Sequence, residues 1–216
     1  MIYTKEDRED LLSHLETIVE ILNKHNIHFW MFAGAVLGYV RDGELIPWDP
    51  DIDLCYWKED FLKMIRLRKE FKKAGLKFFT KEKSARLDWK GSKGQHIGNA
   101  CIELQGDYAV REPLVTDTKF GRIIYFGLII RVLRYNMTNT YRFLRWLALK
   151  SKSCHKTRLV LPAHFYQNLK TIDFFGIKIK IPAETENYLT YVYEDWKTPK
   201  KWDGTPFYYA QKYYET

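Results

Sequence analysis

Three aspartates, Asp49, Asp51 and Asp53, alternate with Pro50 and Ile52 in a short and otherwise apolar stretch. If this stretch is extended, the period of two along a strand places the three carboxylates on one face. Carboxylates gathered in this way repel one another unless a cation neutralises them, and hard ions such as Mg²⁺ prefer oxygen ligands. A solvated acidic turn is the alternative, but the apolar flanks argue against it. The spacing therefore predicts a divalent metal site on a strand.

A glycine-containing stretch lies just upstream, where Gly34 and Gly38 follow the apolar segment 27–33. A glycine directly after a buried strand lets a phosphate approach the backbone, and the start of a following helix attracts anions. A glycine pair alone more often serves a turn or helix packing. Together with the aspartate strand, it indicates a phosphate-binding site.

The patterns around these residues predict the elements that position them. Thr4 can cap an amphipathic helix that ends near His25. Further helices are expected at 36–43, 59–75 and 183–196, strands at 27–34, 51–57, 76–81, 85–91 and 99–107, and a hairpin at 171–182. This order predicts an α/β (α+β) fold in which a mixed β-sheet is flanked by helices. A chain of 216 residues is long enough for one domain, 1–216, with an insertion.

The formal charge of +8 is unevenly distributed, because no acidic residue occurs between Asp117 and Asp173. We interpret residues 119–158 as a basic, aromatic, helical insertion. Four of its arginines recur on roughly one helical face: Arg131, Arg134, Arg142 and Arg145. Such a helix can contact an anionic membrane surface or a polyanionic acceptor, and a packed helix with solvated arginines is the alternative.

The three cysteines are widely spaced, which fits a reducing compartment better than a disulfide framework. The charged N-terminus lacks the apolar core of a signal peptide, and no apolar run is long enough to cross a bilayer. We therefore expect a cytoplasmic protein that lies peripherally at the inner face of the membrane.

The string GAVLGYVRDGELIPWDPDID, residues 34–53, resembles the LicD/fukutin family within the nucleotidyltransferase superfamily. The resemblance continues in the strand CIEL, which includes Glu103, and in a C-terminal block at 161–199. One departure is Glu194, which follows Tyr193 where the family has glycine. Another is Ala35, where the superfamily has serine or glycine, so the backbone must bind the phosphate there.

The resemblance implies a nucleotidyltransferase-like fold and transfer of a phospho-alcohol group from a CDP-activated donor, with CMP as the leaving group. Phosphocholine and polyol phosphates such as ribitol phosphate are the expected groups. The acceptor would be a hydroxyl of a cell-surface glycan, a lipid-linked glycan or a teichoic acid. Phosphoryl transfer requires in-line positioning and charge neutralisation by metal ions and cations rather than covalent participation of the protein.

The same resemblance implies roles for individual acids. Asp51 and Asp53 would hold Mg²⁺ or Mn²⁺ against the donor diphosphate, with Asp49 as a further ligand or a loop anchor. Glu103 would complete the metal site or accept the proton of the acceptor hydroxyl. Asp88 is a rival third acid.

The donor phosphates would be bound by Gly34, Ala35, Gly38 and Arg41, with a surface salt bridge as the alternative role for Arg41. His96 could touch a phosphate, although a surface histidine is the commoner case.

Two other functions use the same features. A nucleotidyltransferase that transfers NMP to a sugar phosphate, a small molecule or RNA would need the same carboxylates. A non-catalytic module would use the basic insertion to bind membrane or nucleic acid, but it would have no need of the acids. The IPWD block at 46–49 and the C-terminal block favour the phosphotransferase over both, so we expect an enzyme without a nucleic-acid partner.

Overall fold

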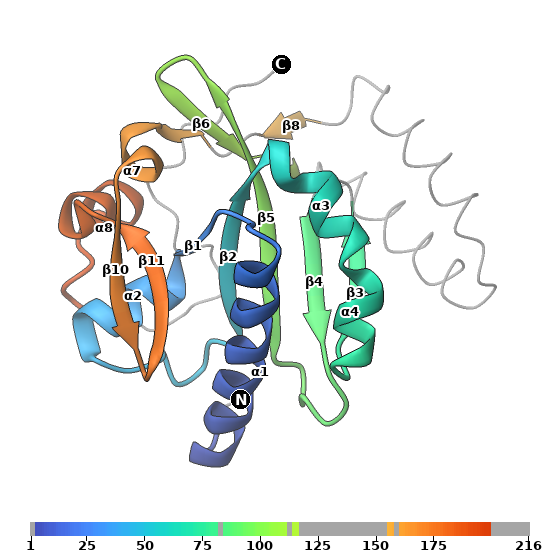
Figure 1. Cartoon of the computed structure of the whole chain (residues 1–216). Coiled ribbons are helices and arrows are strands. Elements are labelled where there is room, and N and C mark those ends of the chain that lie inside the picture. Colours follow the sequence, from blue (N-terminus) through green and yellow to red (C-terminus); the bar gives the residue numbers. More distant parts are fainter. Residues whose placement is uncertain (1–2, 82–83, 112–113, 117–154, 158–159, 200–216) are drawn as a thin grey trace. The chain divides into compact units, whose positions relative to one another are not determined.

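The computed structural model describes residues 3–81, 84–111, 114–116, 155–157 and 160–199 (Figure 1). The chain divides into two compact units, Met1–Arg111 with Leu161–Gln211 and Glu112–Val160 with Lys212–Thr216. In the second unit, β7 (Leu114–Thr116) pairs antiparallel with β8 (His155–Thr157). The rest of the basic insertion expected at 119–158 lies outside the described residues. So do the four arginines expected at a membrane or polyanion: Arg131, Arg134, Arg142 and Arg145.

The first unit is built on a seven-stranded mixed sheet, in which five strands follow the order β1-β2-β5-β4-β3. The bounds are β1 (Phe29–Phe32), β2 (Asp51–Trp57), β3 (Lys77–Lys81), β4 (Ser84–Asp88), β5 (His96–Gln105), β6 (Tyr108–Arg111) and β9 (Val160–Pro162). β2 and β5 run parallel, whereas β1–β2, β4–β5, β3–β4 and β5–β6 are antiparallel pairs. β9 pairs with β6. The predicted mixed sheet flanked by helices is confirmed.

The N-terminal helix α1 (Lys5–Lys24) begins where the sequence predicted it. The Thr4 hydroxyl accepts from the Asp7 backbone N–H at 3.2 Å, and the Asp7 carboxylate accepts from the Thr4 backbone N–H at 3.0 Å. This reciprocal capping box satisfies two of the N–H groups that a helix start leaves without a partner.

The helix expected at 59–75 is interrupted. A short 3-10 helix, η1 (Lys58–Asp60), leads into α3 (Phe61–Arg66), and α4 (Arg68–Lys73) follows after Leu67. At Leu67 the backbone N–H donates to the Met64 carbonyl, three residues back, which tightens the turn locally. Leu67 is buried, so the break lets both short helices direct apolar side chains at the sheet.

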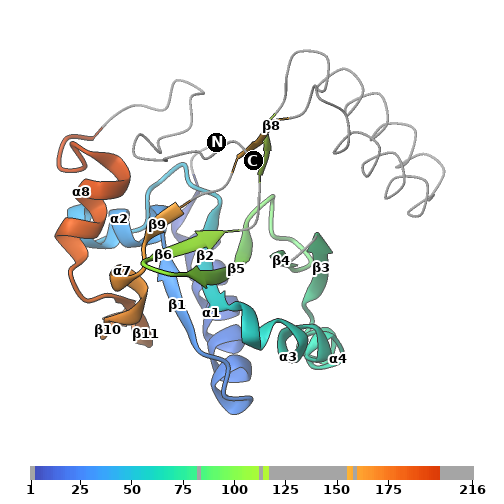
Figure 2. The same cartoon turned by 90° about the horizontal axis from the view of Figure 1, so that it is seen from above.

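One face of the sheet is covered by α1, α3 and α4, which lie along the same side in Figure 2. Phe71 of α4 stacks on Phe78 of β3 at a ring separation of 5.5 Å. His14 of α1 stacks on Trp89, just beyond β4, at 4.3 Å. Leu87 points to this same face of β4 and is fully buried. The alternate residues of β3 and β4 must therefore point to the other face.

The opposite side of β1 carries α2 (Gly34–Asp42), and the C-terminal elements lie near it (Figure 1). These are α7 (His164–Gln167), the hairpin of β10 (Leu169–Phe174) and β11 (Ile177–Pro182), and α8 (Thr185–Tyr193). The Tyr39 hydroxyl of α2 donates to the Asp173 carbonyl of the hairpin at 2.7 Å. The hairpin and the last helix agree with the sequence prediction, and Gly176 takes the left-handed conformation (φ +89) at the turn.

Among the described residues, no helix combines the length and apolar character that crossing a bilayer requires.

Asp60 is a buried carboxylate that ties the start of β1 to the start of α3. Its side chain, 6% exposed, accepts from the His28 backbone N–H at 3.1 Å and from Lys63 Nζ at 2.6 Å. Asp60→Ala should lower the free energy of unfolding by about 2 kcal/mol, because the His28 N–H and Lys63 both lose their partner. Urea denaturation measures this, with the exposed neighbour changed in Glu59→Ala as control. Equal losses in both variants would contradict the role.

Candidate active site on the open sheet face

β2 carries the two central aspartates to one face of the sheet. In the parallel pairing with β5, Asp51 lies opposite His96 and Asp53 lies opposite Gly98. Ile52, between the two aspartates, is fully buried and belongs to the helix-covered face. Asp51 and Asp53 therefore share the other face, because strand side chains alternate.

Two of the aspartates lie directly against glycines. A Cβ added to Gly98 would sit 2.0 Å from Oδ1 of Asp53, and one added to Gly34 would sit 2.3 Å from Oδ2 of Asp49. Separations this short leave no space for a side chain. Both positions therefore accommodate a carboxylate because they are glycine.

The other residues expected at a donor phosphate have different neighbours. A Cβ at Gly38 would lie 2.6 Å from the Glu44 backbone oxygen and 3.0 Å from the Ile46 backbone nitrogen. Gly38 thus permits the loop after α2 to pack on the helix, and the structure does not bring it to the aspartates. Ala35 is buried in the first turn of α2.

Asp49 is close to the negatively charged side chains of Asp51 and Asp53. Burial, followed by the negative charges of Asp51 and Asp53, raises the pKa of Asp49 to about 8. Burial would also raise the pKa of Asp51, but hydrogen bonds with His96 and Asp49 outweigh it and hold that pKa below its ordinary value. Asp49 therefore keeps a proton near neutral pH and shares it with the ionised Asp51.

His96 reaches the aspartates from β5. Its Nε2 lies 3.1 Å from Oδ2 of Asp51, and its Nδ1 lies 3.3 Å from the Gly94 carbonyl. Burial would lower the pKa of His96, but the hydrogen bond and negative charge of Asp51 outweigh it and raise that pKa. The surface histidine considered from the sequence is thus half-buried in the site.

The turn between β1 and α2 is strained. Ala33 adopts φ 58 and ψ −129, a left-handed conformation that is costly for a residue with a side chain. Its backbone N–H donates to the hydroxyl of Tyr188, a fully buried residue of α8, at 3.1 Å. The C-terminal helix therefore helps to hold the turn that places Gly34 beside Asp49.

Glu103 does not join this cluster, and the expectation that it completes the metal site is corrected. The β2–β5 register runs from Asp51 opposite His96 to Trp57 opposite Ile102, so Glu103 lies beyond the far end of β2. Seven residues beyond His96, it also points to the opposite face, because strand side chains alternate. Its carboxylate pairs with Lys58.

Two residues of β4 lie on the aspartate face instead. Arg86 is opposite Gly98 in the antiparallel β4–β5 pairing, and Asp88 follows two positions later on the same face. Arg86 Nε donates to Oδ1 of Asp88 at 2.5 Å. Asp88, the rival third acid considered from the sequence, therefore lies on the same sheet face as Asp51 and Asp53, whereas Glu103 does not. Arg86 was not predicted from the sequence, although the alternating pattern of residues 85–89 places it on one strand face with Asp88.

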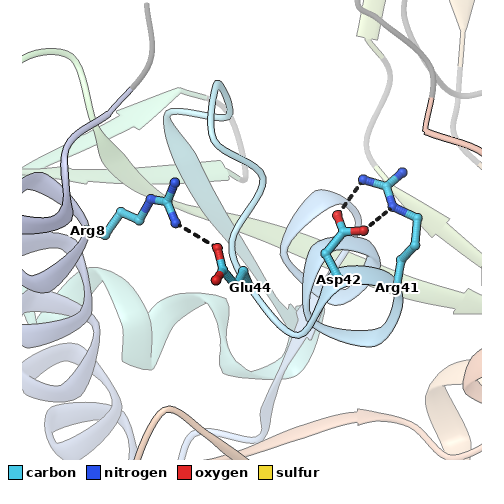
Figure 3. A network of polar contacts seen from close by, with 4 residues as sticks. All are labelled: Arg8, Arg41, Asp42 and Glu44. Atoms are coloured by element: carbon cyan, nitrogen blue, oxygen red, sulfur yellow. Dashed lines mark hydrogen bonds and ion pairs between the residues drawn. The ribbon is translucent and has the colours of Figure 1, made fainter.

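Arg41 is held in the last turn of α2. Its Nε and Nη2 donate to the two carboxylate oxygens of Asp42 at 2.9 and 2.7 Å (Figure 3). The hydrogen bond from Arg41, with its charge, lowers the pKa of Asp42. Figure 3 also shows Arg8 of α1 paired with Glu44 at 3.2 Å, on the loop that leads to the aspartates. Arg41 thus forms a salt bridge with Asp42, which was the alternative to the phosphate contact expected from the sequence.

The donor set is all oxygen at Asp49, Asp51 and Asp53. In the part of the chain that the structure describes, no group of three or more His, Cys, Asp or Glu side chains is arranged as metal ligands. Mg²⁺, however, commonly binds one or two carboxylates and completes its shell with waters and substrate phosphates. The pKa of Asp49 is raised in part because Asp51 and Asp53 repel a third negative charge. A bound cation would relieve that repulsion as the proton does, so these residues fit such an ion.

Gly98→Ala should displace the Asp53 carboxylate and lower the free energy of unfolding by about 1 kcal/mol or more. The loss should shrink in the Asp53→Ala background, because the colliding atoms are then absent. Urea denaturation of both single variants and the double variant measures the coupling. Additive losses would show that Gly98 serves some other purpose.

The raised pKa of Asp49 predicts a pH dependence of stability. Between the ordinary aspartate value near 4 and about 8, the folded protein holds a proton that the unfolded chain has lost. The free energy of unfolding should therefore fall as pH rises through this range. Asn at this position is neutral in both states, so Asp49→Asn should flatten the profile in metal-free buffer. The exposed Asp107→Asn is the matched control, and a slope unchanged in Asp49→Asn would refute the assignment.

Residues 26–122 match the sequence model of the family described as LicD/FKTN/FKRP, nucleotidyltransferase domain. A search of solved structures found the lincosamide antibiotic adenylyltransferase LnuA bound to lincomycin, at a TM-score of 0.44 and 11% identity, over 88% of this chain and 87% of that one.

Curated relatives match over short or divergent stretches. Human ribitol-5-phosphate transferase FKTN is 26% identical over 196 residues, which cover 88% of this chain and 34% of the relative. Human ribitol 5-phosphate transferase FKRP is 40% identical over 43 residues, 20% of this chain and 9% of the relative. An uncharacterized protein of Rickettsia typhi is 38% identical over 56 residues, 26% of this chain and 18% of the relative.

This chain thus spans about a third or less of the length of these relatives. The family match covers the glycine turn, the aspartate strand and β5, which are the elements that build the site. The resemblance found in the sequence is confirmed, because residues 26–122, just under half of the chain, match the LicD/FKTN/FKRP nucleotidyltransferase-domain model.

Proposed function

We propose that this protein is a metal-dependent phosphotransferase that moves a phospho-alcohol group from a CDP-activated donor to a hydroxyl of a glycan, releasing CMP. The observation that carries the proposal is the placement of Asp51 and Asp53 on one open face, within the segment that matches the family. Transfer between two oxygens needs charge neutralisation and in-line positioning, which a rigid strand bearing carboxylates supports.

Asp51 and Asp53 would hold Mg²⁺ or Mn²⁺, and Asp49 adjoins them as a further ligand. The ion would neutralise the charge of the donor diphosphate during transfer. His96 holds the Asp51 carboxylate through Nε2, and Gly98 leaves room for that of Asp53. These contacts restrict rotation of the Asp51 and Asp53 side chains, which fixes the position of a phosphate bound through the metal ion.

The choice of a CDP-linked polyol phosphate rests on the relatives. FKTN and FKRP are described as ribitol 5-phosphate transferases, and the family resemblance implies cytidine-linked donors. We extend both to this chain as a proposal, with phosphocholine as another transferred group. A glycan, a lipid-linked glycan or a teichoic acid would provide the acceptor hydroxyl. We also propose peripheral contact between the basic segment 119–158 and an anionic membrane, since a cluster of arginines attracts acidic lipids.

The test is a thermal-shift and turnover panel with CDP-ribitol, CDP-glycerol, CDP-choline, CTP and UDP-sugars, each with Mg²⁺ or Mn²⁺. We expect stabilisation by cytidine ligands only, and CMP release when a glycan acceptor is added. Asp51→Asn and Asp53→Asn should each lower CMP release at least about 100-fold, because the charge that binds the cation is lost.

Asp107→Asn, an exposed aspartate at the β5–β6 turn, is the matched control and should leave turnover unchanged. Stabilisation confined to non-cytidine ligands would overturn the donor assignment. Pyrophosphate release from CTP would instead identify a nucleotidyltransferase. Binding without turnover under any condition, together with tight salt-dependent RNA or vesicle binding, would identify a non-catalytic module.

A further inference from the structure

The sheet face that carries the aspartates continues across β4 and β3. In register, Asp53 of β2 is followed by Gly98 of β5, Arg86 of β4 and Phe79 of β3. Residues directly opposite one another in a sheet share a face, so these four positions form one row. Gly98 has no side chain, and the Asp53 carboxylate occupies the space over it, on the side of β2 that faces β4 and Arg86.

This part of the face is open, although the helices bury the other face. Arg86 has a side chain 48% exposed, and Phe79 is 52% exposed. Their neighbours Phe78 and Leu87, which point the other way, are buried. An exposed arginine beside an exposed aromatic ring is suited to a ligand that has both a charged and an apolar part.

The charge of Arg86 reaches the aspartate cluster. It contributes to the lowered pKa of Asp51, after the hydrogen bonds with His96 and Asp49, and it opposes the rise in the pKa of His96. Its guanidinium therefore lies close enough to interact electrostatically with a group bound at Asp51. Across two strand spacings, about 10 Å, an extended arginine side chain spans most of the separation.

Asp88 holds the guanidinium in place. The hydrogen bond from Arg86 to Asp88 uses the N–H on Nε, while the two terminal amino groups of an arginine can bind a phosphate in a bidentate manner. A carboxylate on one side and an anionic ligand on the other is a favourable setting for a planar guanidinium. Asp88 thus acts as a positioning residue for Arg86.

The site also needs such a cation. Asp51 and Asp53 lie on this face, and their negative charge would repel a phosphate ester. Arg41, the arginine expected from the sequence at a donor phosphate, is paired with Asp42 at the end of α2. Arg86 lies opposite Gly98, and so on the aspartate face, in the same row as Asp53.

We propose that Arg86 is a further substrate-binding residue, which binds a phosphate group of the ligand held at Asp51 and Asp53. The inference rests on the proposed function, since it assigns the binding of a phosphate ester to this face. The phosphate belongs either to the nucleotide donor or to a phosphorylated acceptor. Phe79 provides the apolar surface on which the base or the polyol of that ligand lies.

Calorimetric titration with Mg²⁺ present tests the proposal, with CDP as the donor-type ligand and glycerol 3-phosphate as the acceptor-type ligand. Arg86→Gln should weaken binding of at least one of them about ten-fold or more, because a charged hydrogen bond is lost. Arg86→Lys should recover part of the loss, since the charge returns without the planar fork. The ligand that responds identifies the source of the phosphate.

Arg68→Gln makes the same chemical change in α4, on the helix-covered side, and should leave both affinities within about two-fold of the unaltered protein. Far-ultraviolet circular dichroism and thermal unfolding establish that each variant is folded. Equal affinities in Arg86→Gln and Arg68→Gln would overturn the role of Arg86 and leave the proposed function standing. Failure of the unaltered protein to bind either ligand would overturn both.

Discussion

β2 and β5 run parallel, and their register determines what meets the aspartates. Opposite Asp51 stands His96, a partner that can share its charge, and opposite Asp53 stands Gly98, which makes room for the carboxylate. A shift of one residue would turn every β2 side chain to the other face and bury the acids beneath the helices. The helix-covered face holds the register, because Ile52 and Leu54 are fully buried there.

The repulsion between the acids is handled in three ways. Asp49 stays protonated and shares its proton with Asp51, and the hydrogen bond with His96 on the neighbouring strand lowers the pKa of Asp51. The third way is separation, because Asp88 lies on β4, two strands from β2, and pairs with Arg86 there. Asp51 keeps the negative charge that a divalent cation can use, which is the usual condition of sites for phosphoryl transfer.

The strained turn at Ala33 links the site to the C-terminal part of the chain. A left-handed conformation at a non-glycine residue persists when the surroundings hold it, and here the Tyr188 hydroxyl accepts the hydrogen bond from its N–H. The same turn opens α2 and sets Gly34 beneath Asp49. A C-terminal helix distant in sequence therefore contributes to the geometry of the aspartate loop.

The sequence by itself indicated the family resemblance and the principal helices and strands around the aspartates. The capping box at Thr4, the apolar period of α1 and the alternation of Asp51, Ile52 and Asp53 are local, so they can be found without a structure. The order of strands and the way β4 pairs with β5 are not local. Only the tertiary structure decided that Asp88 and Arg86, rather than Glu103, share the aspartate face. The physical reason is that register and parity between strands depend on the packing of the opposite face, which no single segment encodes.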